Sequence, residues 1–198
     1  MKRHSFSADL PWGQACERAF HEMHRGFLTR TDGRRGDFIV IATGDKLELK
    51  SESYSTTDPF GPEAVRFREA MRIPTPDRGW RRPSPNLFVE RYSSEAEETP
   101  GGPWQAQKNG AVWYVHFFAG DGKVFAYRTD DMVDFMERNM HKYRLCEIQN
   151  QGYITVGYPV PRARVEHLEV RDLFPAVALD VADEAARKEL DTAGSGAR

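Results

Sequence analysis

The sequence predicts an α/β protein with a mixed central sheet flanked by helices. Alternating apolar runs flank a Thr-Gly-Asp turn over residues 36–50, and a second pair, 112–118 and 123–127, is joined by Ala-Gly-Asp-Gly; both patterns are typical of β-hairpins. Apolar residues recur at three- and four-residue spacing over 11–28 and 129–141, which predicts two amphipathic helices beside that sheet. At 198 residues and 39% hydrophobic content, the chain is long enough to bury a full core.

Local signals also predict the remaining elements. Six prolines interrupt residues 51–85, so only a short part of that segment is expected to be helical. In chain order we expect a helix at 63–72, a strand at 87–92, a flexible acidic loop at 93–102, a short helix at 103–108 and a strand at 153–158. Residues 1–180 then form a single domain, and residues 181–198, rich in Ala, Glu and Gly, form a frayed or disordered tail.

The second strand of the first hairpin has one apolar face and one charged face. Because side chains alternate along a strand, Leu47 and Leu49 point one way while Glu48 and Lys50 point the other. Asp37 stands eleven residues before Glu48, at the start of the first strand. A hard cation such as Mg²⁺ would be bound between Asp37 and Glu48, and Lys50 would point at the same phosphate or at the attacking water.

The register of this hairpin decides whether Asp37 can reach Glu48. A two-residue turn at Gly44-Asp45 would leave the two carboxylates about 13 Å apart, at about 3.3 Å per residue, which is too far to share a metal. A four-residue loop at 42–45 would place Ile39 opposite Glu48 and reduce the offset to about 7 Å, a gap that a bulge could close. We favour the four-residue loop.

The order of these residues resembles a known family. Asp37 and Glu48-Leu49-Lys50 are followed by Asn86-Leu87-Phe88-Val89-Glu90 and then by Gly101-Gly102 before a helix. Over roughly residues 12–160 this order is similar to the PD-(D/E)xK nuclease superfamily, and within it to small phage- and prophage-type members. The resemblance implies a restriction-endonuclease-like fold, Mg²⁺ or Mn²⁺ as cofactor, and hydrolysis of phosphodiester bonds with DNA as the expected substrate.

The resemblance also implies roles for further residues. Glu17, on the first helix, would complete the metal site, with Glu22 as the second choice. Gln105, ahead of Gln107, would orient water or phosphate from the helix at 103–108. Members of the family usually pass from Glu-x-Lys to the Asn-containing strand in fewer residues, so residues 58–82 are expected to be an insertion.

The charge distribution suggests where a nucleic acid would be held. A formal net charge of −2 and a pI near 6.3 argue against a protein that coats nucleic acid without specificity. Basic residues are concentrated locally, however, and the candidates for phosphate contact are Arg66, Arg68, Arg72, Arg78, Arg81, Arg82, Asn86 and Lys108. An exposed helix with ordinary solvated arginines would give the same pattern.

Several alternatives stay open at this level. A Glu-x-Lys-x-Glu strand face is also typical of a solvated surface with cross-strand ion pairs. Asp32 or Glu52 could replace Asp37 as the important carboxylate, an RNA-cleaving member would use the same chemistry, and a degenerate site would bind without cutting. The sequence has no apolar run of membrane-spanning length and no signal-peptide pattern, so we expect a cytoplasmic protein without membrane association and with reduced cysteines.

Overall fold

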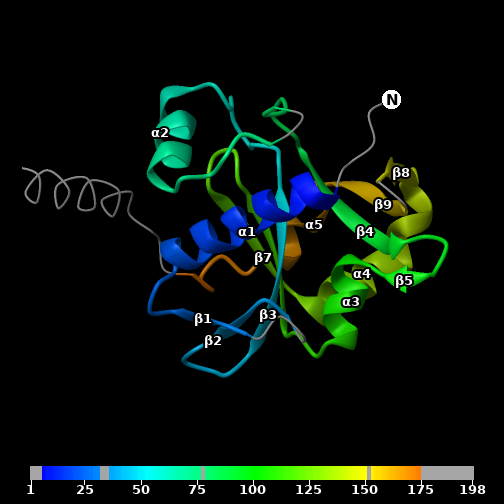
Figure 1. The fold of residues 1–198 in the computed structure, drawn as a ribbon. Helices are drawn as coiled ribbons and strands as arrows, with labels where there is room; N and C mark the ends of the chain where they lie inside the picture. The colour runs from blue at the N-terminus through cyan, green and yellow to red at the C-terminus, as the bar shows by residue number, and fades with distance from the viewer. Residues whose placement is uncertain (1–5, 32–35, 77–78, 151–152, 175–198) are drawn as a thin grey trace, which may run out of the picture.

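The computed structural model describes residues 6–31, 36–76, 79–150 and 153–174, which are arranged as two sheets with helices around them (Figure 1). The first sheet has the order β1-β2-β3-β6-β7. Its strands are β1 (Leu28–Arg30), β2 (Phe38–Val40), β3 (Lys46–Glu52), β6 (Trp113–Phe118) and β7 (Lys123–Arg128). Only β3 and β6 run parallel, so this sheet is mixed and contains both predicted hairpins.

The second sheet was not predicted. Its order is β5-β4-β9-β8, and all its pairs are antiparallel. The strands are β4 (Asn86–Ser94), β5 (Thr99–Pro100), β8 (Cys146–Gln149) and β9 (Ile154–Pro161). The predicted mixed sheet is present, but it is not the only sheet in the described residues. Strand periodicity fixes the existence of a strand but not its partner, and β4 pairs with a strand about seventy residues later.

In the described residues, four α-helices lie near their predicted positions, and the last and shortest one was not predicted. The helices are α1 (Phe6–Met23), α2 (Pro62–Ala70), α3 (Gly102–Lys108), α4 (Thr129–Asn139) and α5 (Arg162–Val165), with 3-10 turns at Met140–Lys142 and Glu166–Leu168. The first helix ends earlier than residue 28 because the chain turns at Gly26, whose φ is +85°, and enters β1. Phe27 lies beyond the helix but packs on the core, which is why its position in the sequence fitted the apolar spacing of a helix.

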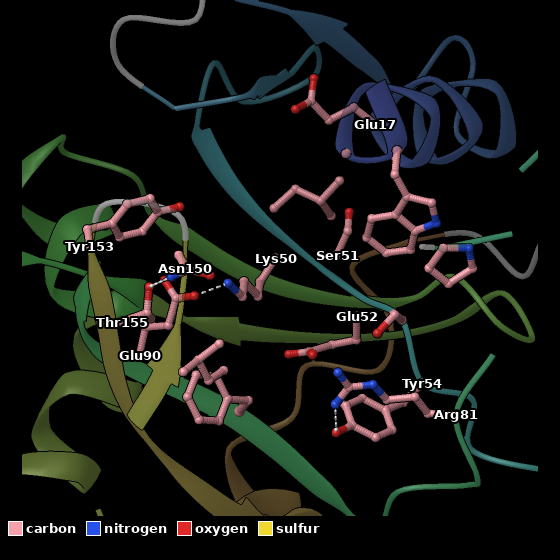
Figure 2. Close-up of a pocket in the computed structure, with 17 residues that line it drawn as sticks. Glu17, Lys50, Ser51, Glu52, Tyr54, Arg81, Glu90, Asn150, Tyr153 and Thr155 are labelled. Atoms are coloured by element: carbon pink, nitrogen blue, oxygen red, sulfur yellow. Dashed lines mark hydrogen bonds and ion pairs between the residues drawn. The ribbon is translucent and has the colours of Figure 1, made fainter. Parts of the chain in front are cut away.

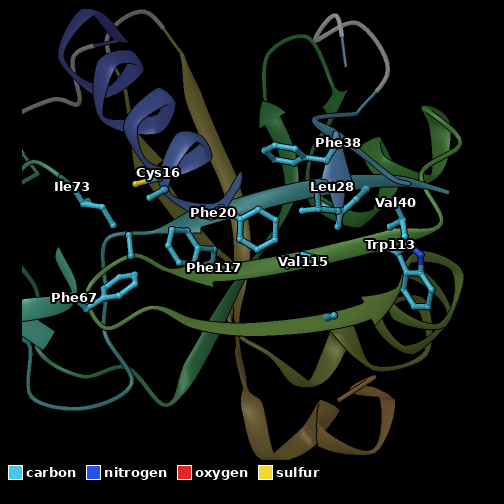
Figure 3. Packing of buried hydrophobic residues seen from close by; sticks show 14 residues of the cluster. Cys16, Phe20, Leu28, Phe38, Val40, Phe67, Ile73, Trp113, Val115 and Phe117 are labelled. Carbon is cyan, nitrogen blue, oxygen red and sulfur yellow. The ribbon is translucent and has the colours of Figure 1, made fainter. Parts of the chain in front are cut away.

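Two apolar clusters lie on opposite faces of the first sheet. The helix α1 covers one face, where Phe20 packs with Phe38 and Phe117 in a cluster that also contains Leu47 (Figure 3). On the other face, Tyr114 and Phe118 of β6 join a cluster with Leu87 and Val89 of β4 and with α3 and α4. The second sheet is therefore packed against the face of the first sheet that α1 leaves uncovered.

This packing decides the environment of the charged face of β3. Glu48, Lys50 and Glu52 stand in register with Tyr114, His116 and Phe118, so they face the second sheet. The side chains of Lys50 and Glu52 are only 27% and 8% exposed. The alternative of an ordinary solvated strand face does not describe this protein.

The hairpin between β2 and β3 has a different register from the one we favoured. Phe38 faces Leu47 and Ile39 faces Lys46, so Ile39 does not oppose Glu48. The connecting loop spans 41–45, one residue longer than the expected 42–45; in it Gly44 adopts a φ of +75° and its N–H donates to Val40 O at 2.8 Å. The observed pairing is shifted by two residues from the favoured one, and this shift brings Asp37 against Leu47, next to Glu48.

Candidate metal and catalytic site

Asp37 is directed onto β3 by an irregularity just before β2. Its N–H donates to Leu47 O at 3.0 Å, although Phe38 is already the partner of Leu47. Two successive residues thus lie against one residue of the neighbouring strand, the arrangement of a β-bulge, which redirects a side chain. The Oδ2 atom of Asp37 accepts the Leu49 N–H at 2.7 Å, and this bond fixes the carboxylate on the β3 edge, beside Glu48.

The carboxyl groups of Asp37 and Glu48 are both harder to ionise than usual. Burial raises the pKa of Asp37 from 3.8 to about 6, and the nearby charge of Glu17 adds to the rise. Burial likewise raises the pKa of Glu48 from 4.5 to about 7, with a further contribution from repulsion by Asp37. Two desolvated carboxylates that repel each other are the electrostatic condition that a bound cation would relieve.

Glu17 lies near this pair but is engaged elsewhere. It projects from α1, and its Oε2 accepts from Arg30 at 2.6 Å. Among the residues that the structure describes, no three His, Cys, Asp or Glu side chains are gathered closely enough to hold a metal. Glu22, the second choice for this role, forms an exposed ion pair with Arg25 at 2.9 Å. Asp37 and Glu48 are thus the carboxylates brought together, and Glu17 contributes charge from nearby.

Lys50 is held by a residue of the second sheet. Its Nζ donates to Glu90 Oε1, and the two side chains are 27% and 17% exposed (Figure 2). Burial opposes the charged form, but the carboxylates of Glu90 and Glu52 outweigh it and raise the pKa of Lys50 above its ordinary value. Lys50 is therefore a fixed positive charge at neutral pH. The sequence pattern included Glu90 but gave no sign of this contact.

Gln105 reaches the site through another amide. Its Nε2 donates to Asn109 Oδ1 at 2.9 Å, and the Asn109 side chain is hydrogen-bonded to Glu48. Because Oδ1 of Asn109 accepts from Gln105, its amide nitrogen is the atom that donates to Glu48. Gln107 instead donates to Asp130 on α4 at 2.8 Å. Sequence reasoning missed Asn109; its place four residues after Gln105, directly after α3, was the available signal.

Glu52 and Asp32 were the two alternatives to Asp37 as the carboxylate that joins Glu48. Glu52 is buried and its Oε1 lies 3.2 Å from Nδ1 of the fully buried His116, so it is committed to that pair. Asp32 lies outside the described residues. Asp37 is accordingly the partner of Glu48 for which the geometry is favourable.

The candidate arginines do not form one surface. Arg68 is buried, donates to Gly120 O at 2.7 Å and stacks on Trp80, so we omit it from any nucleic-acid surface. Arg81 lies against Tyr54, and Arg78 falls outside the described residues. The remaining basic candidates, Arg66, Arg72, Arg82 and Lys108, are exposed.

Asn86 lies apart from the site. It begins β4 opposite Pro161, four residues from Glu90. Four strand residues span about 13 Å, so Asn86 is remote from the Lys50 ion pair. The family-like order Asn-x-x-x-Glu therefore brings only its Glu to the candidate site.

No protein-family model, no curated protein and no solved structure matches this chain. The likeness to the PD-(D/E)xK superfamily thus rests on the residues quoted above, and the function has to be argued from the geometry of the site. Within the described part of the chain, no helix is both long enough and apolar enough to cross a membrane. The two cysteines are unpaired, Cys16 being buried and Cys146 partly so.

Proposed function

We propose that this protein is a divalent-metal-dependent nuclease that hydrolyses phosphodiester bonds, with DNA as its substrate. The observation that carries the proposal is the pair Asp37 and Glu48. Asp37, just before β2, and Glu48, on β3, lie together on the β3 edge and share a desolvated environment that raises both pKa values. Structural ion pairs do not require two neighbouring acids to be held together in this way, whereas cation binding does.

The donor set fits Mg²⁺ or Mn²⁺. Hard cations of this kind are commonly held by one or two carboxylates, with water and substrate phosphate oxygens completing the coordination, so Asp37 and Glu48 suffice. When bound there, the cation would neutralise phosphate charge and lower the pKa of a bound water. Because the carboxylates must be ionised to bind it, affinity is expected to fall below about pH 7, where Glu48 becomes protonated.

Lys50 supplies positive charge and does not act as a base. Its raised pKa and its ion pair with Glu90 keep the ammonium group protonated. A protonated lysine two residues from Glu48 would stabilise the negative charge that develops on the phosphate. Glu90 is then a positioning residue, since it acts through Lys50.

Asn109 and Gln105 hold Glu48 in place. The bond from Asn109 favours the ionised form of Glu48, and Gln105 orients the Asn109 amide through its own bond at 2.9 Å. Such outer contacts typically change metal affinity or activity by about 10- to 100-fold when they are removed. Glu17 would add negative charge on the α1 side of the same cation.

A cleavage assay tests the proposal directly. Purified protein with Mg²⁺ or Mn²⁺ should cut DNA, and a chelator should abolish the cut. Asp37→Asn and Glu48→Gln should each lower activity by more than the roughly 100-fold expected of outer-contact changes. The matched control is Asp134→Asn, because Asp134 is exposed on α4 and remote from β3 in the fold. Cleavage that survives both site substitutions would refute the assignment.

One observation favours a second candidate, a protein that binds nucleic acid without cutting it. In the described residues no third acidic ligand joins Asp37 and Glu48, and Glu17 is held by Arg30. A protein of this kind would bind DNA in the presence of chelator and would leave DNA and RNA intact with either metal. If the protein cleaved RNA but not DNA, the proposed metal chemistry would stand and the proposed substrate would change from DNA to RNA.

A further inference from the structure

A pocket of about 430 Å³ opens beside the candidate site, between β3 and the second sheet (Figure 2). Its volume lies within the range of about 300–1,000 Å³ that is usual for small-molecule sites. Leu49 and Lys50 of β3 line it, and so does Glu17 of α1. Since two strand residues span about 7 Å, the pocket begins close to Glu48 along the same strand.

Aromatic and amide groups from different elements face one another across this pocket. Tyr54, which follows β3, is held in place by two contacts with Arg81. The guanidinium carbon lies 5.1 Å from the Tyr54 ring centroid, and Nη1 donates to the Tyr54 hydroxyl at 2.6 Å. Tyr153 and Asn150 stand on the opposite side, from the connection between β8 and β9 (Figure 2). Trp12 and Phe88 add two more aromatic side chains to the lining.

The Asn150 side of the pocket is braced by hydrogen bonds. The Asn150 N–H donates to Tyr153 O at 3.0 Å, and its Nδ2 donates to Thr155 Oγ1 at 2.8 Å. Thr155 in turn donates to Ser93 O at 3.0 Å. An amide has a second N–H and an acceptor oxygen beyond this bond, which suit the edge of a nucleobase.

The charges of the pocket favour a base over a phosphate. Carboxylates of Glu17, Glu52 and Glu90 line it, and its two positive side chains are already engaged, Lys50 with Glu90 and Arg81 with the Tyr54 hydroxyl. A phosphate inside would therefore be repelled, whereas a neutral ring would stack on the aromatic side chains. The volume also excludes a stacked base pair with its two backbones. The occupant that fits is a single unpaired base whose phosphate remains outside.

We propose that this pocket binds an unpaired nucleobase next to the bond that is cleaved, so that the substrate class is nucleic acid with a single-stranded nucleotide at that position. The inference rests on the proposed nuclease function, which supplies the nucleic acid and places its phosphate at Asp37 and Glu48. The aromatic side chains hold the base by stacking, and Asn150 contacts its edge.

Binding in chelator separates this inference from cleavage. The probes are a labelled ten-nucleotide single strand and the same sequence as a blunt duplex, measured by fluorescence anisotropy with wild-type protein. The single strand should bind more tightly. Tyr153→Ala should weaken single-strand binding by roughly 5- to 150-fold, the loss expected for one stacked base, whereas Tyr153→Phe should retain most of it. Tyr153 is 37% exposed, so this truncation leaves the core intact.

Two further variants make the binding test specific. Asn150→Ala should weaken single-strand binding by roughly 3- to 10-fold through the lost hydrogen bond. Phe60→Ala is the matched control, because Phe60 is an aromatic residue that is 71% exposed and does not line the pocket. Equal affinity for strand and duplex, or equal effects of Tyr153→Ala and Phe60→Ala, would overturn the inference.

The pocket and the nuclease proposal fail in different ways. If the protein cleaves blunt duplex in a Glu48-dependent way and Tyr153→Ala leaves this cleavage unchanged, the nuclease proposal stands and the pocket proposal is refuted. If the protein binds single strands in a Tyr153-dependent way but cleaves no substrate, the pocket stands as a base-binding site and the nuclease proposal is refuted.

Discussion

Asp37→Asn tests the electrostatics of the site in the metal-free protein. The folded-state pKa values of Asp37 and Glu48, about 6 and about 7, lie above the ordinary 3.8 and 4.5. The folded state therefore holds protons that the unfolded state has already released. The contribution of these two carboxyl groups to stability is fully present below their unfolded pKa values and is lost as pH rises through their folded pKa values. Asparagine removes the Asp37 charge and keeps an oxygen that can accept the Leu49 N–H.

The size of the effect follows from the pKa of Asp37. The difference between 3.8 and about 6, at 1.36 kcal/mol per pKa unit, corresponds to a cost on the order of 3 kcal/mol above pH 7. Burial sets most of this cost for Asp37, and its repulsion of Glu48 enters through the raised pKa of Glu48, so the effects of the two residues do not simply add. Asp37→Asn should therefore raise the free energy of unfolding by roughly 2–3 kcal/mol at pH 8, or about 4–12 °C in Tm, and by a small fraction of that at pH 4.

Urea unfolding followed by tryptophan fluorescence, in chelator at pH 4, 6 and 8, measures this difference. The control is Asp134→Asn, whose side chain is 68% exposed and pairs with Arg138 one helical turn away. Losing such a pair changes stability by about 0.5 kcal/mol at most. The reasoning is refuted if Asp37→Asn is no more stable than wild type at pH 8, or if its advantage is the same at pH 4.

Three more predictions follow from the same contacts. Mg²⁺ or Mn²⁺ at ten times Kd should stabilise wild type by roughly 1.4 kcal/mol and Asp37→Asn by far less, as measured by thermal unfolding; equal shifts would show that Asp37 is not a ligand. Lys50→Ala should cost roughly 2 kcal/mol in urea unfolding, because it leaves Glu90 unpaired and mostly buried, and the double variant with Glu90→Gln should recover part of that loss; an additive loss would contradict the ion pair. Asn109→Ala should lower cleavage about 10- to 100-fold and move the acidic limb of the pH–activity profile upward, since the lost bond favoured ionised Glu48; an unmoved limb would argue against that contact.

Local pattern was enough to predict most elements and the residues at the centre of the site. Period-two alternation over β3 put Glu48 and Lys50 on one face, and the helical period located α1 and α4. The loop of the first hairpin begins one residue earlier than predicted and is one residue longer. Its position depends on which residue takes the left-handed conformation, here Gly44, and several residues near the turn were compatible with the pattern.

The sequence by itself determined that the protein is a mixed α/β chain with an acid, an acid and a lysine on one hairpin, because periodicity and turn residues act within a few positions of the chain. Only the tertiary structure decided what faces that hairpin. The second sheet covers the charged face and pairs Lys50 with Glu90, forty residues away, and the turn after α3 brings Asn109 to Glu48. Such contacts are set by how complete layers pack, and no local pattern in the chain records which surface will be buried against which.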